Sequence, residues 1–509
     1  MGEEEDFQRK SEFIRCISLF GSSNDDKIIF RSICSHIIYM LPNKKKIATG
    51  GYSLIFHPAI DTKGNEIDDL SYVTKLQTPS YSSDNEIAIS KIIREIKNYT
   101  YHFSPIVMDT RVDVSVLQYM GTREEFKEVE RILWDEKEKG FSEEYVYMMI
   151  PYVGSNEFHQ HICRLLYSVI LVQRYQSEEE GTRMKWRNNP RIQYGLQHIY
   201  AESEINDAFI ATYPLNQLRN DFIILFIDGF SHILDSISIL LDHGIIHHDL
   251  KEQNILYNEE LTVPILIDFG LSLRRENLNA DTYMDYFFVY KPSYFIWSPD
   301  IHLINLILHD EQRTLAEFDD AYITQFVDTY LHHAKKKVLF PFFSSKEIET
   351  YRENLITYYC SLYKSVKEER IHVPKTGFQQ LYKSILCHKE REKDMDYDGE
   401  RRNAEEVVIE KLLENYKKWD LYSLCITYIS MCTRINTMIF EYKKDHAEIL
   451  HKRFNEEYNS VLYYNVTPFY REIKQLLFEI LQPSYHIIDH RKEFTILKNR
   501  IQEYICQGL

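Results

Sequence analysis

The sequence predicts an α+β fold with a small N-terminal part rich in β-strands and a larger, mostly helical C-terminal part. Residues 47–56 fit a strand, a glycine turn and a second strand, and residues 72–76 alternate in the manner of a further strand. The later apolar stretches favour helices, chiefly over 221–242 and through most of 301–410. Two short apolar runs at 255–256 and 265–267 suit buried strands that hold polar residues on rigid supports.

Composition excludes several classes of protein. The chain has 509 residues, 44% of them apolar and 27% charged, which is an ordinary globular composition. A net charge of −17 argues against a general nucleic-acid binder. The acidic start lacks the apolar core of a signal peptide, and polar residues interrupt the most apolar run, Phe222–Leu241, so we expect a packed helix and no membrane association. Eight cysteines without a C-x-x-C pair favour reduced thiols in a cytoplasmic setting.

The most informative pattern lies in residues 247–270, where the run HHDLKEQN is followed by DFG. Phosphoryl transfer needs a carboxylate that orients the attacking hydroxyl and oxygen ligands that hold Mg²⁺ against the nucleotide phosphates. We assign the first role to Asp249, with Lys251 placed to neutralise charge on the transferred group. Asn254 and Asp268 are the predicted metal ligands. The alternative interpretation is purely structural: Asp249 and Asn254 form a turn, and Asp268 caps a strand.

This pattern resembles the catalytic loop and the metal loop of the protein kinases. The resemblance implies a bilobal kinase-like fold, with a small β-rich N-lobe at 41–152 and a large helical C-lobe at 153–509. Residues 1–40 are then an N-terminal extension. Long insertions interrupt the C-lobe at about 173–220 and 301–410.

The resemblance extends to a degenerate glycine-rich loop at 47–56. Ala48 and Ser53 stand at the first and third glycine positions of the family pattern, so only its central glycine remains, and a plain hairpin is the alternative reading. Backbone amides at such a turn cover phosphates closely. The residues expected to bind ATP here are Gly50, Gly51, Ser53 and Ile55.

A lysine on the next strand is expected to anchor the nucleotide phosphates. The resemblance implies that Lys75 pairs with a glutamate of the following helix. We expect Asp84 or Asn85 to cap the start of that helix. Both Glu86 and Glu95 share a helical face with apolar residues, so periodicity does not decide between them. We favour Glu86, because it fits the compact form of this region in divergent kinases.

Further family positions fall in the C-terminal part. His248 replaces the usual arginine that receives an activation-loop phosphate, so we expect activity without loop phosphorylation. Asp300 closes the activation segment, and its family-like cationic partner is Arg491. Ser293 matches the residue that positions the catalytic carboxylate, and Asp420 is expected to organise the catalytic loop, with a helix N-cap as its alternative role.

The predicted function is ATP- and Mg²⁺-dependent transfer of a phosphoryl group to Ser or Thr hydroxyls of protein substrates. Some less specific features resemble the protein kinases of large nucleocytoplasmic DNA viruses. These features are a Gly-Gly-Tyr loop, a Tyr-Val-x-Lys strand, a His-x-Asp motif without arginine and a Trp-x-Pro end to the activation segment. This resemblance implies that the protein is located in the host cytoplasm or the virion. The insertion at 301–410 is a predicted docking region for partners. The rival functions are a pseudokinase or virion scaffold, which the missing glycines favour, and a small-molecule phosphotransferase.

Overall fold

A computed structural model describes the greater part of the chain. The N-terminal extension at 1–40, Gly50, Gly51 and most of the segment 173–220 lie outside the described residues. The described residues are 46–49, 53–113, 134–135, 140–141, 144–154, 156–163, 165, 215–279, 282–309, 319–334, 339, 342–369, 406–447 and 472–508.

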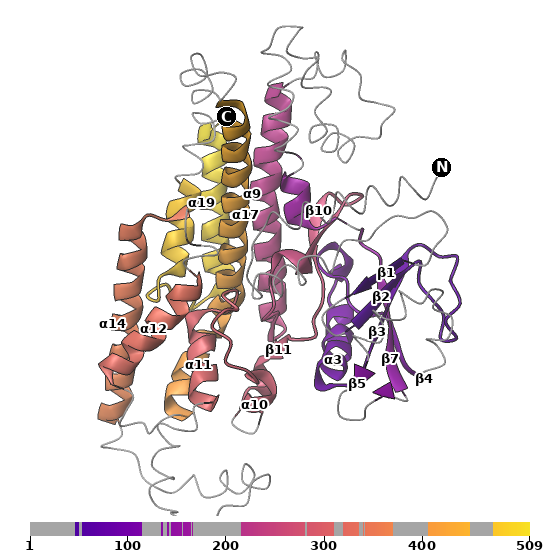
Figure 1. Ribbon diagram of the computed structural model, residues 1–509, viewed down its shortest axis with the longest axis horizontal. Coiled ribbons are helices and arrows are strands. Elements are labelled where there is room, and N and C mark those ends of the chain that lie inside the picture. Colours follow the sequence, from indigo (N-terminus) through magenta and orange to yellow (C-terminus); the bar gives the residue numbers. More distant parts are fainter. Residues whose placement is uncertain are drawn as a thin grey trace, which may run out of the picture. The chain divides into compact units, whose positions relative to one another are not determined.

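An antiparallel sheet forms the N-terminal region, in the strand order β1-β2-β3-β7-β4 (Figure 1). Its strands are β1 (Lys46–Thr49), β2 (Ser53–His57), β3 (Tyr72–Gln77), β4 (Met108–Asp113) and β7 (Glu144–Pro151), and a separate ribbon pairs β5 (Trp134–Asp135) with β6 (Gly140–Phe141). Within β3, Lys75 lies opposite Ile55 of β2 and Met148 of β7. Strands β3 and β7 are therefore inner strands of this sheet.

Helix α3 (Tyr81–Glu95) begins earlier than its sequence suggested. The backbone N–H of Ser80 donates to Ser83 Oγ at 2.9 Å, and the backbone N–H of Ser83 donates back to Ser80 Oγ at 3.3 Å. This reciprocal bonding satisfies helix-end donors in the manner of a capping box. The predicted caps, Asp84 and Asn85, are therefore wrong, because the serine pair closes the first turn before them.

The C-terminal region is helical. Its long helices are α9 (Leu215–Asp242), α11 (Pro299–His309), α12 (Asp320–Ala334), α14 (Ser345–Glu369), α17 (Tyr416–Ala447) and α19 (His490–Gly508). A short helix, α10 (Tyr283–Tyr286), precedes α11. Helices α17 and α19 run along α9 (Figure 1). Four short strands lie among them as two antiparallel pairs, β8 (Ile245–Ile246) with β11 (Leu273–Arg274) and β9 (Ile255–Asn258) with β10 (Val263–Leu266).

Helix α9 packs inside the core of this region because its sequence is apolar. Its stretch Asn220–Asp242 is long and apolar enough to cross a membrane by length and composition, but Phe226, Ile233 and Leu240 are buried in the largest apolar cluster. The helix ends at Asp242, and Gly244 two residues later has a φ of +68°, a left-handed conformation that glycine adopts without strain.

The described part of residues 301–410, which we expected to be an insertion, packs into the same core. Helices α11, α12 and α14 bury Ile304, Phe326, Tyr330 and Tyr359 in the apolar cluster that also contains α9 and α17. Two compact units result from the contacts of the chain: one holds residues up to Ile87 together with Pro105–Ser155, and the other holds Ala88–Ser104 together with the chain from Asn156. The architecture is thus α+β, with a sheet-rich N-terminal region and a helical C-terminal part.

Candidate functional site

The polar residues of the 247–254 run interlock in the C-terminal unit. Lys251 Nζ donates to Asp249 Oδ2 at 2.7 Å, and Asn254 Nδ2 donates to the same oxygen at 2.9 Å. Asn254 Nδ2 also donates to the backbone carbonyl of Asp249 at 2.8 Å, which fixes the turn between them. The carboxylate is therefore held in one orientation by a cation and an amide.

A buried aspartate of α17 holds the backbone that leads into this run. The N–H of His247 donates to one oxygen of Asp420 at 2.6 Å, and the N–H of His248 donates to the other at 2.9 Å. Burial raises the pKa of Asp420, and these two donors and His247 oppose the rise. The predicted contact of Asp420 with the loop is present. Its alternative role as an N-cap is wrong, because α17 begins before it, at Tyr416.

Hydrogen bonds bring the second polar segment against the first. The N–H of Ile267 donates to the carbonyl of Asn254 at 3.0 Å, and His247 Nε2 lies 3.0 Å from the carbonyl of Ile267. Asp268 follows with a φ of +64°, which turns the chain sharply after β10. Burial alone would lower the pKa of Lys251, but the charges of Asp249 and Asp268 outweigh it and raise that pKa. The two carboxylates therefore share one electrostatic neighbourhood.

Oxygen atoms suited to Mg²⁺ are present at this place. Asn254 Oδ1 is buried and has no hydrogen-bond partner among the described residues, although its amide nitrogen is fully used. An orphaned buried acceptor of this kind fits a metal ligand, because a bound cation would satisfy it. Asp268, whose charge acts on Lys251, would supply the carboxylate. Among the described residues no group of three or more His, Cys, Asp or Glu forms a metal cluster, and Mg²⁺ at nucleotide sites needs only one or two protein ligands beside phosphates and water.

In the N-terminal unit, Lys75 forms a buried ion pair with Glu86. Lys75 Nζ lies 2.7 Å from Glu86 Oε2, and the two residues are 7% and 2% exposed. Glu95, the other candidate, is exposed at the end of α3. Of the expected loop residues, Ser53 is buried at the start of β2 and Ile55 is half-buried opposite Lys75.

The predicted partner of Asp300 is wrong. Arg491 instead donates to Asp242 at 2.8 Å, and its side chain is 71% exposed. Asp300 is buried and accepts hydrogen bonds from Tyr359 Oη at 2.7 Å and Asn415 Nδ2 at 3.1 Å. The reason is that α14 and the residue before α17 supply these neutral donors, while Arg491 pairs with Asp242.

Burial keeps His248 neutral, so it carries no charge that could attract a phosphate. Its ring stacks on Trp297 with centroids 5.1 Å apart, and within the part of the chain that the structure describes both ring nitrogens are buried without a hydrogen-bond partner. Burial lowers the pKa of His248 to about 3, against the opposing effect of Asp249. The residue has a φ of +65°, which is unusual for a side chain with a Cβ.

Sequence reasoning missed the residue that contacts the other oxygen of Asp249. The phenol of Tyr294 donates to Asp249 Oδ1. Ser293, the expected positioning residue, makes no hydrogen bond to Asp249 or Lys251 in the described part of the chain. No signal in the sequence distinguished Tyr294 from the other tyrosines of this segment.

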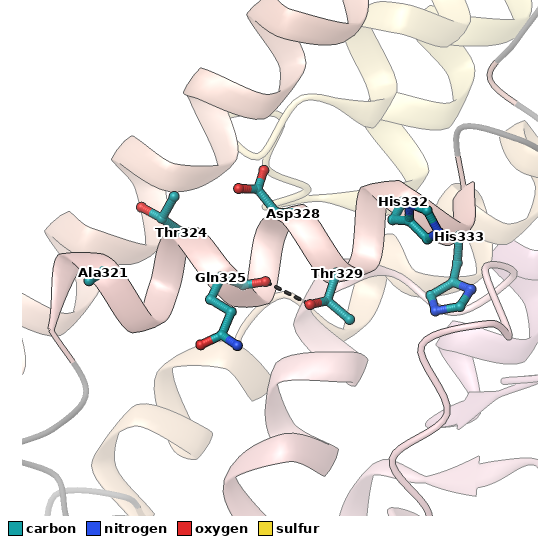
Figure 2. Close-up of a pocket in the computed structure, with 7 residues that line it drawn as sticks. All are labelled: Ala321, Thr324, Gln325, Asp328, Thr329, His332 and His333. Carbon is teal, nitrogen blue, oxygen red and sulfur yellow. Dashed lines mark hydrogen bonds between the residues drawn. The ribbon is translucent and has the colours of Figure 1, made fainter.

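One surface hollow lies apart from the motif residues, on the outer face of α12. Figure 2 shows that its lining comes from that helix alone and is polar except for Ala321, with Thr329 Oγ1 donating to the carbonyl of Gln325 at 2.8 Å. Asp328 in this row already binds Arg352 of α14 at 2.6 Å. The hollow is therefore an exposed helix face and contributes nothing to the site around Asp249.

Comparison of the sequence with models of protein families gives no match, and comparison with curated proteins gives none either. The residues of the site therefore carry the functional argument alone.

Proposed function

We propose that this chain is an ATP- and Mg²⁺-dependent protein kinase with a bilobal kinase-like fold, which transfers the γ-phosphoryl group to Ser or Thr hydroxyls of protein substrates. The observation that carries the proposal is the carboxylate of Asp249, fixed by Lys251 and Asn254 and close enough to Asp268 for both carboxylates to raise the pKa of Lys251. The α+β architecture, with its N-terminal antiparallel sheet and helical C-terminal part, is consistent with it.

Each residue has a distinct task in this proposal. Asp249 accepts a hydrogen bond from the acceptor hydroxyl and so directs its oxygen lone pair toward phosphorus. The ammonium of Lys251 offsets charge that develops on the transferred group. Lys251 also favours Ser and Thr over Tyr acceptors, by the family resemblance.

The remaining residues bind the nucleotide. Asn254 Oδ1 and Asp268 would hold Mg²⁺, which supplies positive charge to the phosphate oxygens when bound. The ammonium of Lys75, kept in place by Glu86, is assigned to the nucleotide phosphates. Backbone amides near Gly50, Gly51 and Ser53 are assigned to the same phosphates.

The decisive experiment is radiolabel transfer from ATP to a mixed set of proteins, with Mg²⁺ and with a chelator. Asp249→Ala should lower transfer by about 10²–10⁴-fold, the usual contribution of a positioned catalytic base. Nucleotide affinity should persist, because Lys75 and Asp268 remain. Asp249→Asn keeps the side-chain shape and should lose transfer equally. Asp242→Ala, at an exposed ion pair with Arg491, is the matched control and should retain activity.

Three results would contradict the proposal. Unchanged turnover in Asp249→Ala would remove that residue from the chemistry. Nucleotide binding without transfer to any acceptor would favour a scaffold. Transfer to small hydroxyl compounds but to no protein would favour a small-molecule phosphotransferase.

A further inference from the structure

The two oxygens of the Asp249 carboxylate have different partners. Oδ2 accepts hydrogen bonds from Lys251 and Asn254, which belong to the same loop. Oδ1 accepts one from the phenol of Tyr294, 45 residues further along the chain. Asp249 is only 3% exposed. The oxygen that is free of loop donors is thus covered by a side chain from another segment.

Tyr294 is held in this position from several sides. Its backbone N–H donates to the carbonyl of Lys291 at 2.8 Å, and its own carbonyl lies 3.0 Å from His302 Nε2. Its ring meets the ring of Trp297 edge to face, with centroids 5.0 Å apart. Trp297 in turn donates from Nε1 to the carbonyl of His248 at 2.9 Å, next to Asp249. The contact with the carboxylate is therefore built into the packing of this segment.

The phenol is also chemically suited to a lasting hydrogen bond with a carboxylate. Burial raises the pKa of Tyr294 well above its ordinary value, and the adjacent charge of Asp249 raises it further. The hydroxyl consequently keeps its proton and remains a donor at neutral pH. A hydrogen bond from a neutral hydroxyl to an ionised carboxylate is stronger than one between neutral groups.

We propose that Tyr294 is an internal occupant of the acceptor site, whose hydroxyl takes the place on Asp249 that an incoming Ser or Thr hydroxyl must take. This inference rests on the proposed function, because it assigns that role to Asp249. The described conformation is then a latent one. An acceptor must displace the phenol from Oδ1 before its own hydroxyl is oriented, so acceptor and Tyr294 compete.

Steady-state kinetics of Tyr294→Phe test this competition. Loss of the phenol should lower the KM for a protein acceptor by about tenfold, the order expected when one hydrogen bond to a charged group no longer competes. The kcat at saturating acceptor and the KM for ATP should not change. If the hydroxyl of Tyr294 only held Asp249 in position, its removal would instead lower kcat. Tyr290→Phe is the matched control: burial raises the pKa of Tyr290 to about 12 in the same segment, and no hydrogen bond joins it to Asp249 among the described residues.

Each outcome bears on the inference. A lower acceptor KM in Tyr294→Phe alone supports it. An unchanged or higher acceptor KM, or a lower kcat, overturns it while the kinase function stands. Phosphate on Tyr294 after incubation with ATP and Mg²⁺, read by mass spectrometry, also overturns it, since the phenol would then be an acceptor. If neither the wild type nor Tyr294→Phe transfers phosphate to a protein, the proposed function is wrong, and the inference that depends on it is wrong as well.

Discussion

Two buried carboxylates, Glu86 in the N-terminal unit and Asp300 in the C-terminal unit, are stabilised in opposite ways. In the N-terminal unit, Glu86 faces the ammonium of Lys75 at 2.7 Å. In the C-terminal unit, Asp300 accepts hydrogen bonds from the neutral donors Tyr359 and Asn415. Burial raises its pKa, although these bonds and the charge of the buried Lys418 oppose the rise. A buried charge is costly unless it is paired or suppressed. The first unit pairs its charge, and the second moves its carboxylate toward the neutral form.

Suppression of charge is general around the C-terminal core. Burial lowers the pKa of His248 to about 3 and that of His302 to about 4, so both rings are neutral at physiological pH. The pair of Asp249 and Lys251 is the contrast, because there a carboxylate and an ammonium lie 2.7 Å apart. Charge is thus retained at the place where the proposed chemistry needs it.

The largest effect is expected from breaking the N-terminal pair. Lys75→Met leaves the carboxylate of Glu86 buried without its cation, which should lower the free energy of unfolding by about 3–5 kcal/mol in urea denaturation. The double variant Lys75→Met/Glu86→Leu should recover much of the loss, because no charge is then buried alone. Glu95→Ala, at the exposed candidate, should change neither stability nor nucleotide affinity. An unaffected nucleotide affinity in Glu86→Ala would contradict the assigned role of the pair.

These partners differ in how far the sequence could reveal them. Glu86 lies on the helical face of Ile89 and Ile93, which the structure buries, so periodicity carried real information although it did not decide alone. The contact of Asp420 with the loop was expected from the family resemblance. The partner of Asp300 was not, since Tyr359 lies on α14, whose packing no motif describes. Long-range contacts between helices depend on the whole core rather than on spacing along the sequence.

A smaller effect is expected from the neutral histidine of the C-terminal unit. The pKa of His248 is about 3 in the folded protein and 6.5 when unperturbed, so the unfolded chain binds the extra proton between these values. Stability therefore falls as pH drops below 6.5. His248→Asn removes this titration and tolerates the φ of +65°. Between about pH 7 and pH 4 the variant should lose roughly 3 kcal/mol less unfolding free energy than the wild type. Equal losses in thermal or urea unfolding would show that the ring is not held neutral.

The smallest effect is expected from removing one of the neutral hydrogen-bond donors to Asp300. Tyr359→Phe removes the 2.7 Å hydrogen bond without changing ring packing, and should lower the free energy of unfolding by about 2 kcal/mol. It should also raise the pKa of Asp300 further, because that bond opposes the effect of burial. The loss should therefore grow as pH rises through the range where Asp300 ionises, which urea unfolding at several pH values measures. Arg491→Ala is the control and should have no measurable effect, since that side chain serves Asp242 at the surface. If Arg491→Ala lowered the free energy of unfolding more than Tyr359→Phe does, Arg491 would be the partner of Asp300 after all. The contrast between Glu86 and Asp300 would then not hold.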